Sequence, residues 1–178
     1  FVADTANNAI RQVVISTGVV STFTTTGLSA PTGVAVDAAG NVYVSDTGNN
    51  VIKRYNSSGV LTLTIGTGTA GNLNSTLLLS TFHSPQGIAV KSDGSFIYVA
   101  DSGTLSLNIR RIDVANTAVT TLATMTKPWG LALNSAGTTL YVTDYNTGTV
   151  SSIANPQTAG TLVALTGTYT NPSAVTVD

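Results

Sequence analysis

A short segment that begins with proline recurs four times along this chain. Each copy continues with a variable residue, a glycine or alanine, and an alternation of aliphatic and small side chains. The copies are Pro31–Asp37, Pro85–Lys91, Pro128–Asn134 and Pro172–Asp178. The later copies are about 43 residues apart, a period typical of architectures in which each unit is one supersecondary structure packed against its neighbours. The repeat is therefore stronger evidence for the fold class than any single residue.

A second recurring segment ends in aspartate and follows each of the first three proline segments. Its copies are Asn41–Asp46, Phe96–Asp101 and Thr139–Asp144, and Phe1–Asp4 matches the last four residues of these copies. In the first copy Val42 and Val44 alternate with Tyr43 and Ser45. This period of two is typical of a β-strand.

Each unit contains four short strand signals separated by turn residues. In the unit that starts at Pro31 they are residues 33–37, 41–45, 51–55 and 60–65. No segment combines a 3.6-residue apolar stripe with capping residues, so we expect essentially no helix. Four strands in about 43 residues predict an all-β fold, a β-propeller of four-stranded antiparallel blades. The predicted boundaries are a partial blade at 1–30, blades at 31–84, 85–127 and 128–171, and the first strand of a next blade at 172–178.

Three motifs of the unit from Pro31 carry a family resemblance. They are P-x-G-V-A-V-D at 31–37, G-N-V-Y-V-S-D-T-G-N-N at 40–50 and V-I-K-R-Y at 51–55. Together they resemble the NHL repeat, and residues 65–71 with 82–87 are similar to the inter-blade connector of secreted and microbial NHL proteins. The resemblance implies a closed ring, often of six blades, so we expect about four blades here as part of a larger ring. The alternative is a closed four-bladed ring in which the last segment completes the first blade.

The amino-acid composition argues against several classes of function. Charged residues make up 8% of the chain, against about 25% in ordinary soluble domains, and the net charge is −1. Without a basic excess we expect no nucleic-acid partner. The chain has no cysteine, and no apolar run reaches the ~20 residues that span a bilayer. A surface kept soluble by Ser and Thr hydroxyls favours an extracellular or cell-surface protein.

A carboxylate recurs once per unit, at Asp4, Asp46, Asp101 and Asp144. One interpretation is a ring of metal ligands. The interpretation that we favour is an Asx-type turn, in which the carboxylate accepts hydrogen bonds from backbone N–H groups. We therefore predict no metal site and no cofactor.

A basic residue follows three of these aspartates, and the three residues are Arg11, Lys53 and Arg110. In the fourth unit Ser151 stands instead. A basic ring would suit an acidic partner, and NHL proteins of the tripartite-motif class bind RNA with such a face. The alternative is that these are exposed strand charges or inter-blade ion pairs. We keep the three residues as candidate partner-binding residues, with RNA binding as the weakest functional alternative.

The only tryptophan, Trp129, occupies the variable position after the repeat proline. Thr32, Gln86 and Ser173 hold this position in the other units. In propellers the position lies near the channel mouth, where Trp129 could stack on a sugar or on a partner's side chain. The alternative is local packing over the proline turn. Trp129, Gln86 and Thr32 are therefore candidate partner-binding residues.

The sequence offers little support for catalysis. Amidating-lyase propellers use several histidines for zinc, and His83 is the only histidine here. Sugar-lactonase propellers rely on a channel glutamate, and this chain has none. No G-x-S-x-G motif marks a catalytic serine. We predict no catalytic residue, and a lyase or lactonase with its metal site in blades not present here remains the alternative.

Two sequence features bear on surface interactions. Asn56-Ser-Ser58 and Asn74-Ser-Thr76 match the N-glycosylation pattern, so Asn56 and Asn74 are candidate glycan sites of a glycoprotein. The long spacer at 66–84 contains Leu77, Leu78 and Leu79, which either pack back on the blade edge or protrude as a contact loop. We conclude that the chain is a non-catalytic binding or structural module. Its expected partner is a protein or a glycan, including other copies or segments of the same assembly.

Overall fold

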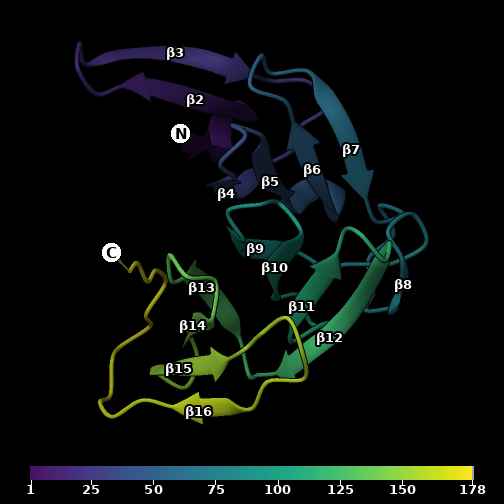
Figure 1. Ribbon diagram of the computed structural model, residues 1–178, viewed down its shortest axis with the longest axis vertical. Coiled ribbons are helices and arrows are strands. Elements are labelled where there is room, and N and C mark those ends of the chain that lie inside the picture. The colour runs from purple at the N-terminus through teal and green to yellow at the C-terminus, as the bar shows by residue number, and fades with distance from the viewer. Residues whose placement is uncertain (178) are drawn as a thin grey trace.

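The computed structural model describes residues 1–177 and consists of four antiparallel sheets that fan around a common centre (Figure 1). The first sheet contains β1 (Val2–Asp4), β2 (Ala9–Val14) and β3 (Val19–Thr24). The second contains β4 (Pro31–Val36), β5 (Val42–Asp46), β6 (Val51–Tyr55) and β7 (Leu61–Ile65). The third contains β8 (Ser75–Thr76), β9 (Pro85–Val90), β10 (Phe96–Asp101), β11 (Asn108–Asp113) and β12 (Ala118–Thr124). The fourth contains β13 (Pro128–Leu133), β14 (Thr139–Asp144), β15 (Thr149–Ala154) and β16 (Leu162–Ala164). The predicted all-β propeller architecture is confirmed.

The second sheet shows how the repeat sequence builds a blade. Its strands follow one another in sequence order from β4 to β7, so hairpins make every connection. Gly40 and Gly59 close two of these hairpins at φ of +80° and +79°, a left-handed region that glycine adopts without steric cost. The strand limits agree with the predicted ones to within two residues.

Short 3₁₀ turns differ from the expectation of essentially no helix. One turn, η1 (Thr5–Asn7), follows Asp4 and another, η2 (Thr47–Asn49), follows Asp46. Each ends at an asparagine with φ of 50° to 55°, Asn8 or Asn50. Asparagine tolerates this conformation, so the D-T-x-N-N motif makes a tight corner between two strands. No helix among residues 1–177 is long and apolar enough to cross a bilayer.

The core lies between neighbouring blades. In β10, Ile97 packs toward the second sheet against Tyr43 and Ile52, while the adjacent Tyr98 packs toward the fourth sheet with Leu140. Successive strand residues point to opposite faces, so one blade contributes to two cores. Each such fully buried side chain stabilises the fold by roughly 1.5–3 kcal/mol.

The long spacer packs mainly onto the third blade. β8 pairs with the outer strand β12 through Thr76↔Ala118 and Ser75↔Val119, and Phe82 is fully buried. Leu77 is buried as well, but Leu78 and Leu79 are 67% and 61% exposed. The spacer is thus an edge cover with two protruding leucines, a combination of the two predicted alternatives.

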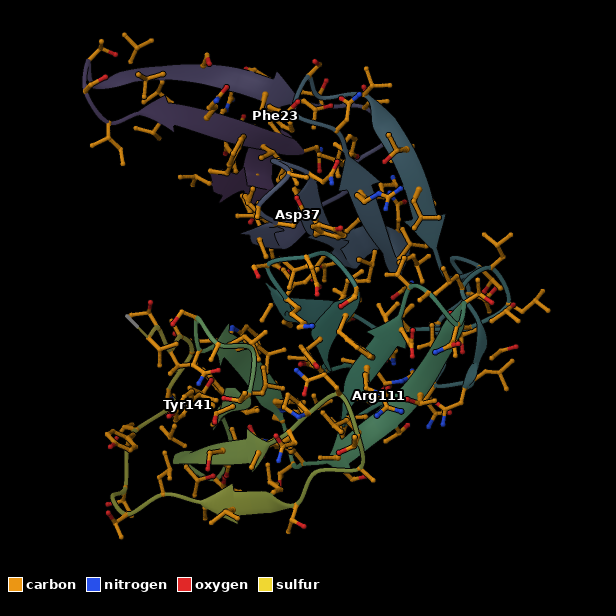
Figure 2. The ribbon with its side chains drawn as sticks, in the orientation of Figure 1. Phe23, Asp37, Arg111 and Tyr141 are labelled. Carbon is orange, nitrogen blue, oxygen red and sulfur yellow. The ribbon has the colours of Figure 1, made fainter. Side chains whose placement is uncertain are left out.

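Side chains also join the outer parts of neighbouring blades. Arg111, labelled in Figure 2, reaches from β11 to the carbonyls of Gln157 at 2.7 Å and Thr158 at 2.8 Å in the loop between β15 and β16 of the fourth blade. Within the first blade, Phe23 meets Phe1 edge-on at 4.8 Å between ring centroids. The Arg111 hydrogen bonds therefore join the third blade to the fourth.

The four sheets form an open arc, with the two ends of the chain on its open side (Figure 1). The expected strand at 172–178 is not formed within residues 172–177, because no second strand lies beside it to complete a ladder. Asp178 lies outside the described residues. The segment does not pair with β1, so the structure contains no closed four-bladed ring among residues 1–177. Ser173 and Ala174 lie instead against Gly130 of β13.

Candidate functional site

The recurring aspartates anchor the chain where it enters each blade. Asp46 accepts a 2.7 Å hydrogen bond from the backbone N–H of Ser29, and Asp101 accepts one of 2.7 Å from His83. Asp144 likewise accepts the backbone N–H of Thr126 at 2.8 Å. In all three cases the donor lies two residues before the repeat proline. Within residues 1–177, no three His, Cys, Asp or Glu side chains lie close enough together to hold a metal ion.

The residue after each aspartate joins one blade to the next. Thr5 donates its hydroxyl to the carbonyl of Pro31 at 2.8 Å, and Thr47 donates to Pro85 at 2.6 Å. Ser102 makes the same bond to the carbonyl of Pro128. In the D-T and D-S dipeptides, the carboxylate therefore accepts hydrogen bonds within its own blade. The hydroxyl of the next residue donates a hydrogen bond to the following blade.

The candidate basic residues pair with these same aspartates. Arg11 lies 2.8 Å from Asp4, and Lys53 lies 2.6 Å from Asp46. The side chains of Arg11 and Lys53 are 31% and 9% exposed. Lys53 also donates to the carbonyl of Gly27. Two of the three predicted partner-binding cations are thus engaged in ion pairs inside their own blade.

The third cation, Arg110, is fully buried. It lies 3.2 Å from Asp101 and donates to the carbonyls of Leu73 and Thr81 and to Asn74. Burial raises the pKa of Asp101 to about 6 and lowers the pKa of Arg110, against the attraction between the two charges. Arg110 therefore anchors the long spacer from inside the blade and presents no charge to solvent.

The candidate residues Thr32, Gln86 and Trp129 gather around one open cavity of about 200 Å³. We call it the rim cavity. It is lined by the same three positions of all four proline segments, which are Thr32–Val34, Gln86–Ile88, Trp129–Leu131 and Ser173–Val175. The sequence-based grouping of the three candidates thus corresponds to one place in the structure.

Glycine sets the spacing of the strands at this cavity. A Cβ on Gly33 would lie 2.3 Å from the carbonyl oxygen of Gln86, and one on Gly87 would lie 2.2 Å from that of Trp129. Each glycine therefore lets the next blade's backbone approach to a distance that a side chain would prevent.

Trp129 belongs to a cluster that sequence analysis found only in part. Its ring lies 5.1 Å from that of Tyr145 at an interplanar angle of 35°. The ammonium group of Lys127 lies 5.4 Å from the Trp129 ring centroid and 5.2 Å from that of Tyr145. These distances are within the range of cation–π attraction. We call Lys127, Trp129 and Tyr145 the aromatic–lysine cluster.

All three members of the cluster differ from the residues at the same positions of the other blades. Ala30 and Ser84 stand where the fourth blade has Lys127, and Thr47 and Ser102 stand where it has Tyr145. Tyr145 lacks the aliphatic hydroxyl that joins the other blades to their neighbours. The fourth blade thus gives up the inter-blade hydrogen bond of this hydroxyl. A local loss of a structural contact, together with unusual residues at the same place, is typical of functional sites. A position-by-position comparison of the units would have found Lys127 and Tyr145 from the sequence.

The remaining candidates have structural contacts of their own. The Nδ1 atom of His83 accepts the backbone N–H of Leu105 at 3.0 Å. Asn56 is half-buried and its Oδ1 accepts two backbone N–H groups of its own turn. Asn74 is exposed, and its Oδ1 accepts from Arg110 at 2.9 Å and Thr121 at 3.2 Å. Both asparagines bond through oxygen, which leaves the nitrogen that a glycan would modify outside these bonds.

Comparison with family models gives two matches. The family described as "Lactonase, 7-bladed beta-propeller" matches residues 67–178, more than half of the chain, and the NHL repeat matches residues 28–55. The resemblance to NHL proteins is therefore confirmed, although the longer match names seven blades where that resemblance implied six. NHL repeat-containing protein 2 of Gallus gallus is 37% identical over 94 residues, which cover 52% of this chain and 12% of that protein.

Several solved propellers share the fold. The structure resembles a chain of a nidogen–laminin complex with a TM-score of 0.79 and 22% identity, covering 99% of this chain and 63% of that chain. It resembles a gluconolactonase of Xanthomonas campestris with a TM-score of 0.74 and 20% identity, covering 98% and 61%. Virginiamycin B lyase of Staphylococcus aureus matches with a TM-score of 0.69 and 18% identity, covering 96% and 53%. This chain thus spans less than two-thirds of each of these relatives.

Proposed function

Since this chain belongs to the 7-bladed β-propeller lactonase family and carries an NHL repeat, we propose that it is a non-catalytic binding module whose ligand or partner docks at the rim cavity. The observation that carries this proposal is the aromatic–lysine cluster. Lys127, Trp129 and Tyr145 differ from the residues at the same positions of the other blades and lie together beside a polar cavity. The first three blades serve as a rigid scaffold, because their recurring aspartates are paired internally with cations.

The partner we propose is a protein or a glycan, including other copies of the same assembly. A solved propeller of the same fold is named as part of a nidogen–laminin complex, an assembly of two proteins. Aromatic rings beside amide and hydroxyl groups suit both a sugar face and a partner's side chain. We place the protein outside the cell or at its surface, because Ser and Thr supply most of its polar groups.

The test is binding of the labelled intact protein to arrays of glycans and of purified extracellular proteins. We expect at least one saturable interaction that Trp129→Ala weakens tenfold or more. Leu78→Ala, which shortens an exposed side chain on the spacer, is the matched control and should leave that interaction unchanged. If every interaction found is indifferent to Trp129→Ala, the proposed site is wrong.

The glycoprotein proposal has its own measurement. Mass spectrometry of the native protein before and after peptide-N-glycosidase treatment should show deamidation at Asn74, the more exposed of the two candidates. Unmodified Asn56 and Asn74 in protein purified from a eukaryotic secretory host would contradict it.

A second candidate function, a propeller lactonase or lyase, is favoured by the family match at residues 67–178. Its catalytic and metal-binding residues would lie in blades outside this chain. Hydrolysis of δ-gluconolactone by the longest available form of the protein, with Ca²⁺ and with EDTA, separates the two. Metal-dependent turnover that Trp129→Ala does not change would favour the enzyme.

A further inference from the structure

The charge balance of the fourth blade differs from that of the others. Lys53 faces Val44 and Arg110 faces Val99 in the strand register, and the position that faces Val142 holds Ser151. The cation that pairs with the aspartate in the other blades is therefore missing inside the fourth one.

Asp144 does not need that cation. Its carboxylate accepts backbone N–H groups from Thr126, Lys127, Asn146 and Thr147 at 2.8 to 3.1 Å. Burial alone would raise the pKa of Asp144, but these four hydrogen bonds hold it below its usual range. The negative charge of the fourth blade is thus satisfied by the backbone.

The positive charge of the fourth blade lies at the rim instead. Among residues 1–177 no carboxylate oxygen lies within 4.0 Å of the Lys127 ammonium, which rests on the faces of Trp129 and Tyr145. Lys127 is half-buried, and Trp129, on whose ring its ammonium rests, lines the rim cavity. A cation without a counter-ion beside a cavity favours an anionic ligand.

The size and lining of the rim cavity define the rest of the ligand. Drug-sized ligands occupy roughly 300–1,000 Å³, so a cavity of about 200 Å³ admits a single ring. Trp129 contributes its aromatic side chain to the lining, and Thr32, Gln86 and Ser173 contribute hydroxyl and amide groups. Within the described residues 1–177, the Gln86 side chain makes one long hydrogen bond, 3.4 Å to the carbonyl of Ser84, which a ligand hydroxyl can replace.

We infer that the rim cavity binds a pyranose ring that carries a carboxylate, the chemistry of a uronate residue in an acidic glycan. The ring stacks on Trp129, and Lys127 leaves the aromatic faces to pair with the carboxylate. An acidic side chain of a partner protein would use Lys127 but would leave the Trp129 platform and the cavity unfilled. This inference rests on the proposed binding function and names its ligand class.

The single tryptophan makes the test direct. Fluorescence of Trp129 in the intact protein is titrated with sodium D-glucuronate, with D-glucose and with an acetylated Asp-Gly-Asp peptide amide. We expect glucuronate to bind at least tenfold more tightly than glucose or the peptide, and its affinity to fall with added salt. Lys127→Met should weaken glucuronate about tenfold, the size of one charged hydrogen bond, and leave glucose unchanged.

Lys91→Met is the matched control, because it removes one positive charge from a lysine that pairs with Asp93. It should leave all three titrations unchanged, and thermal melting should show that both variants fold. Equal affinity for glucose and glucuronate would overturn the proposal that the ligand is anionic. It would not contradict the proposal that the protein is a binding module. Tighter binding of the peptide would assign the site to an acidic protein segment, and no response to any of the three would also overturn the inference.

Discussion

The hydroxyl of Thr47 donates a 2.6 Å hydrogen bond to the carbonyl oxygen of Pro85, which belongs to the next blade. Thr5 and Ser102 make the equivalent bond to Pro31 and Pro128. The contact repeats because the dipeptide and the proline are both part of the repeat. It joins backbone to side chain at the rim, where each blade meets its neighbour.

Removing this hydroxyl should weaken the fold measurably. Thr47→Val keeps the shape of the side chain but removes the shorter of two hydroxyl donors to the Pro85 carbonyl, which keeps the 3.3 Å bond from Thr32, so we expect a loss of about 0.5–1.5 kcal/mol in the free energy of unfolding. Urea denaturation measures it. Thr62→Val, which removes an exposed hydroxyl from the outer strand, is the control and should stay within about 0.5 kcal/mol. Equal losses in both variants would contradict an inter-blade role for Thr47.

The buried ion pair predicts a larger effect. Arg110→Met leaves the Asp101 carboxylate buried without its cation, so the free energy of unfolding should fall by about 3–5 kcal/mol. The double variant Asp101→Asn with Arg110→Met should regain part of that loss, since it removes the stranded charge. Hydrogen exchange should also show faster opening of residues 73–81, which Arg110 holds. Unchanged exchange in the spacer would contradict that anchoring.

Gly87→Ala tests the spacing of the rim. Its Cβ would lie 2.2 Å from the carbonyl oxygen of Trp129, so the blades must separate, and we expect a loss of about 1–3 kcal/mol or more. Gly18→Ala is the comparison, since no atom lies within 4 Å and only the penalty of its φ of +70° remains, about 1 kcal/mol. Thermal melting of the two variants ranks them, and a lower melting temperature for Gly18→Ala would refute the close approach.

The turn around Asp37, labelled in Figure 2, predicts a dependence on acid. Burial alone would raise the pKa of Asp37, but hydrogen bonds from Asn41, Tyr43 and Ala39 lower it below the ordinary 3.8. Because the folded pKa is depressed, this stabilisation is present above pH 3.8 and is lost as the pH falls through the lowered value. Melting temperatures between pH 6 and pH 2 should therefore fall more steeply for the wild type than for Asp37→Asn. Parallel curves would show that Asp37 does not contribute.

Tyr145→Thr separates stability from binding. Threonine is the residue of the second blade at this position, so we expect the free energy of unfolding to change by less than about 1 kcal/mol. Ligand affinity should fall, since the cluster loses one of its two rings. A strongly destabilised Tyr145→Thr with normal binding would mean that Tyr145 serves packing alone.

The repeat predicts much of this structure because local rules suffice for it. Alternation in Val42–Ser45 and glycine at the hairpins define strands without reference to distant residues. The two-residue strand β8 was not predicted, because Ser75 and Thr76 are paired only by Ala118 and Val119, which are distant in sequence. A strand of two residues is too short to show a period of two in the sequence, and its pairing partners are distant along the chain.

The candidate site was predicted only in part for a related reason. Trp129 stood out because it is the only tryptophan, whereas Lys127 and Tyr145 are ordinary residue types that become unusual only against the other units. The burial of Arg110 depends on the spacer, whose carbonyls at Leu73 and Thr81 receive its guanidinium. From sequence alone, a basic residue on a strand is expected to be exposed to solvent. Only the folded spacer shows that Arg110 is buried.

The glycines of the proline segments make the neighbouring variable residue interchangeable. Because Gly33 and Gly87 set the distance between blades through backbone contact, the side chain one position earlier can differ from blade to blade, as Thr32, Gln86 and Trp129 do. Each proline segment therefore contributes one variable side chain, and these side chains line the same rim cavity. New recognition can then arise by exchanging single side chains, blade by blade, on an architecture that does not have to be rebuilt.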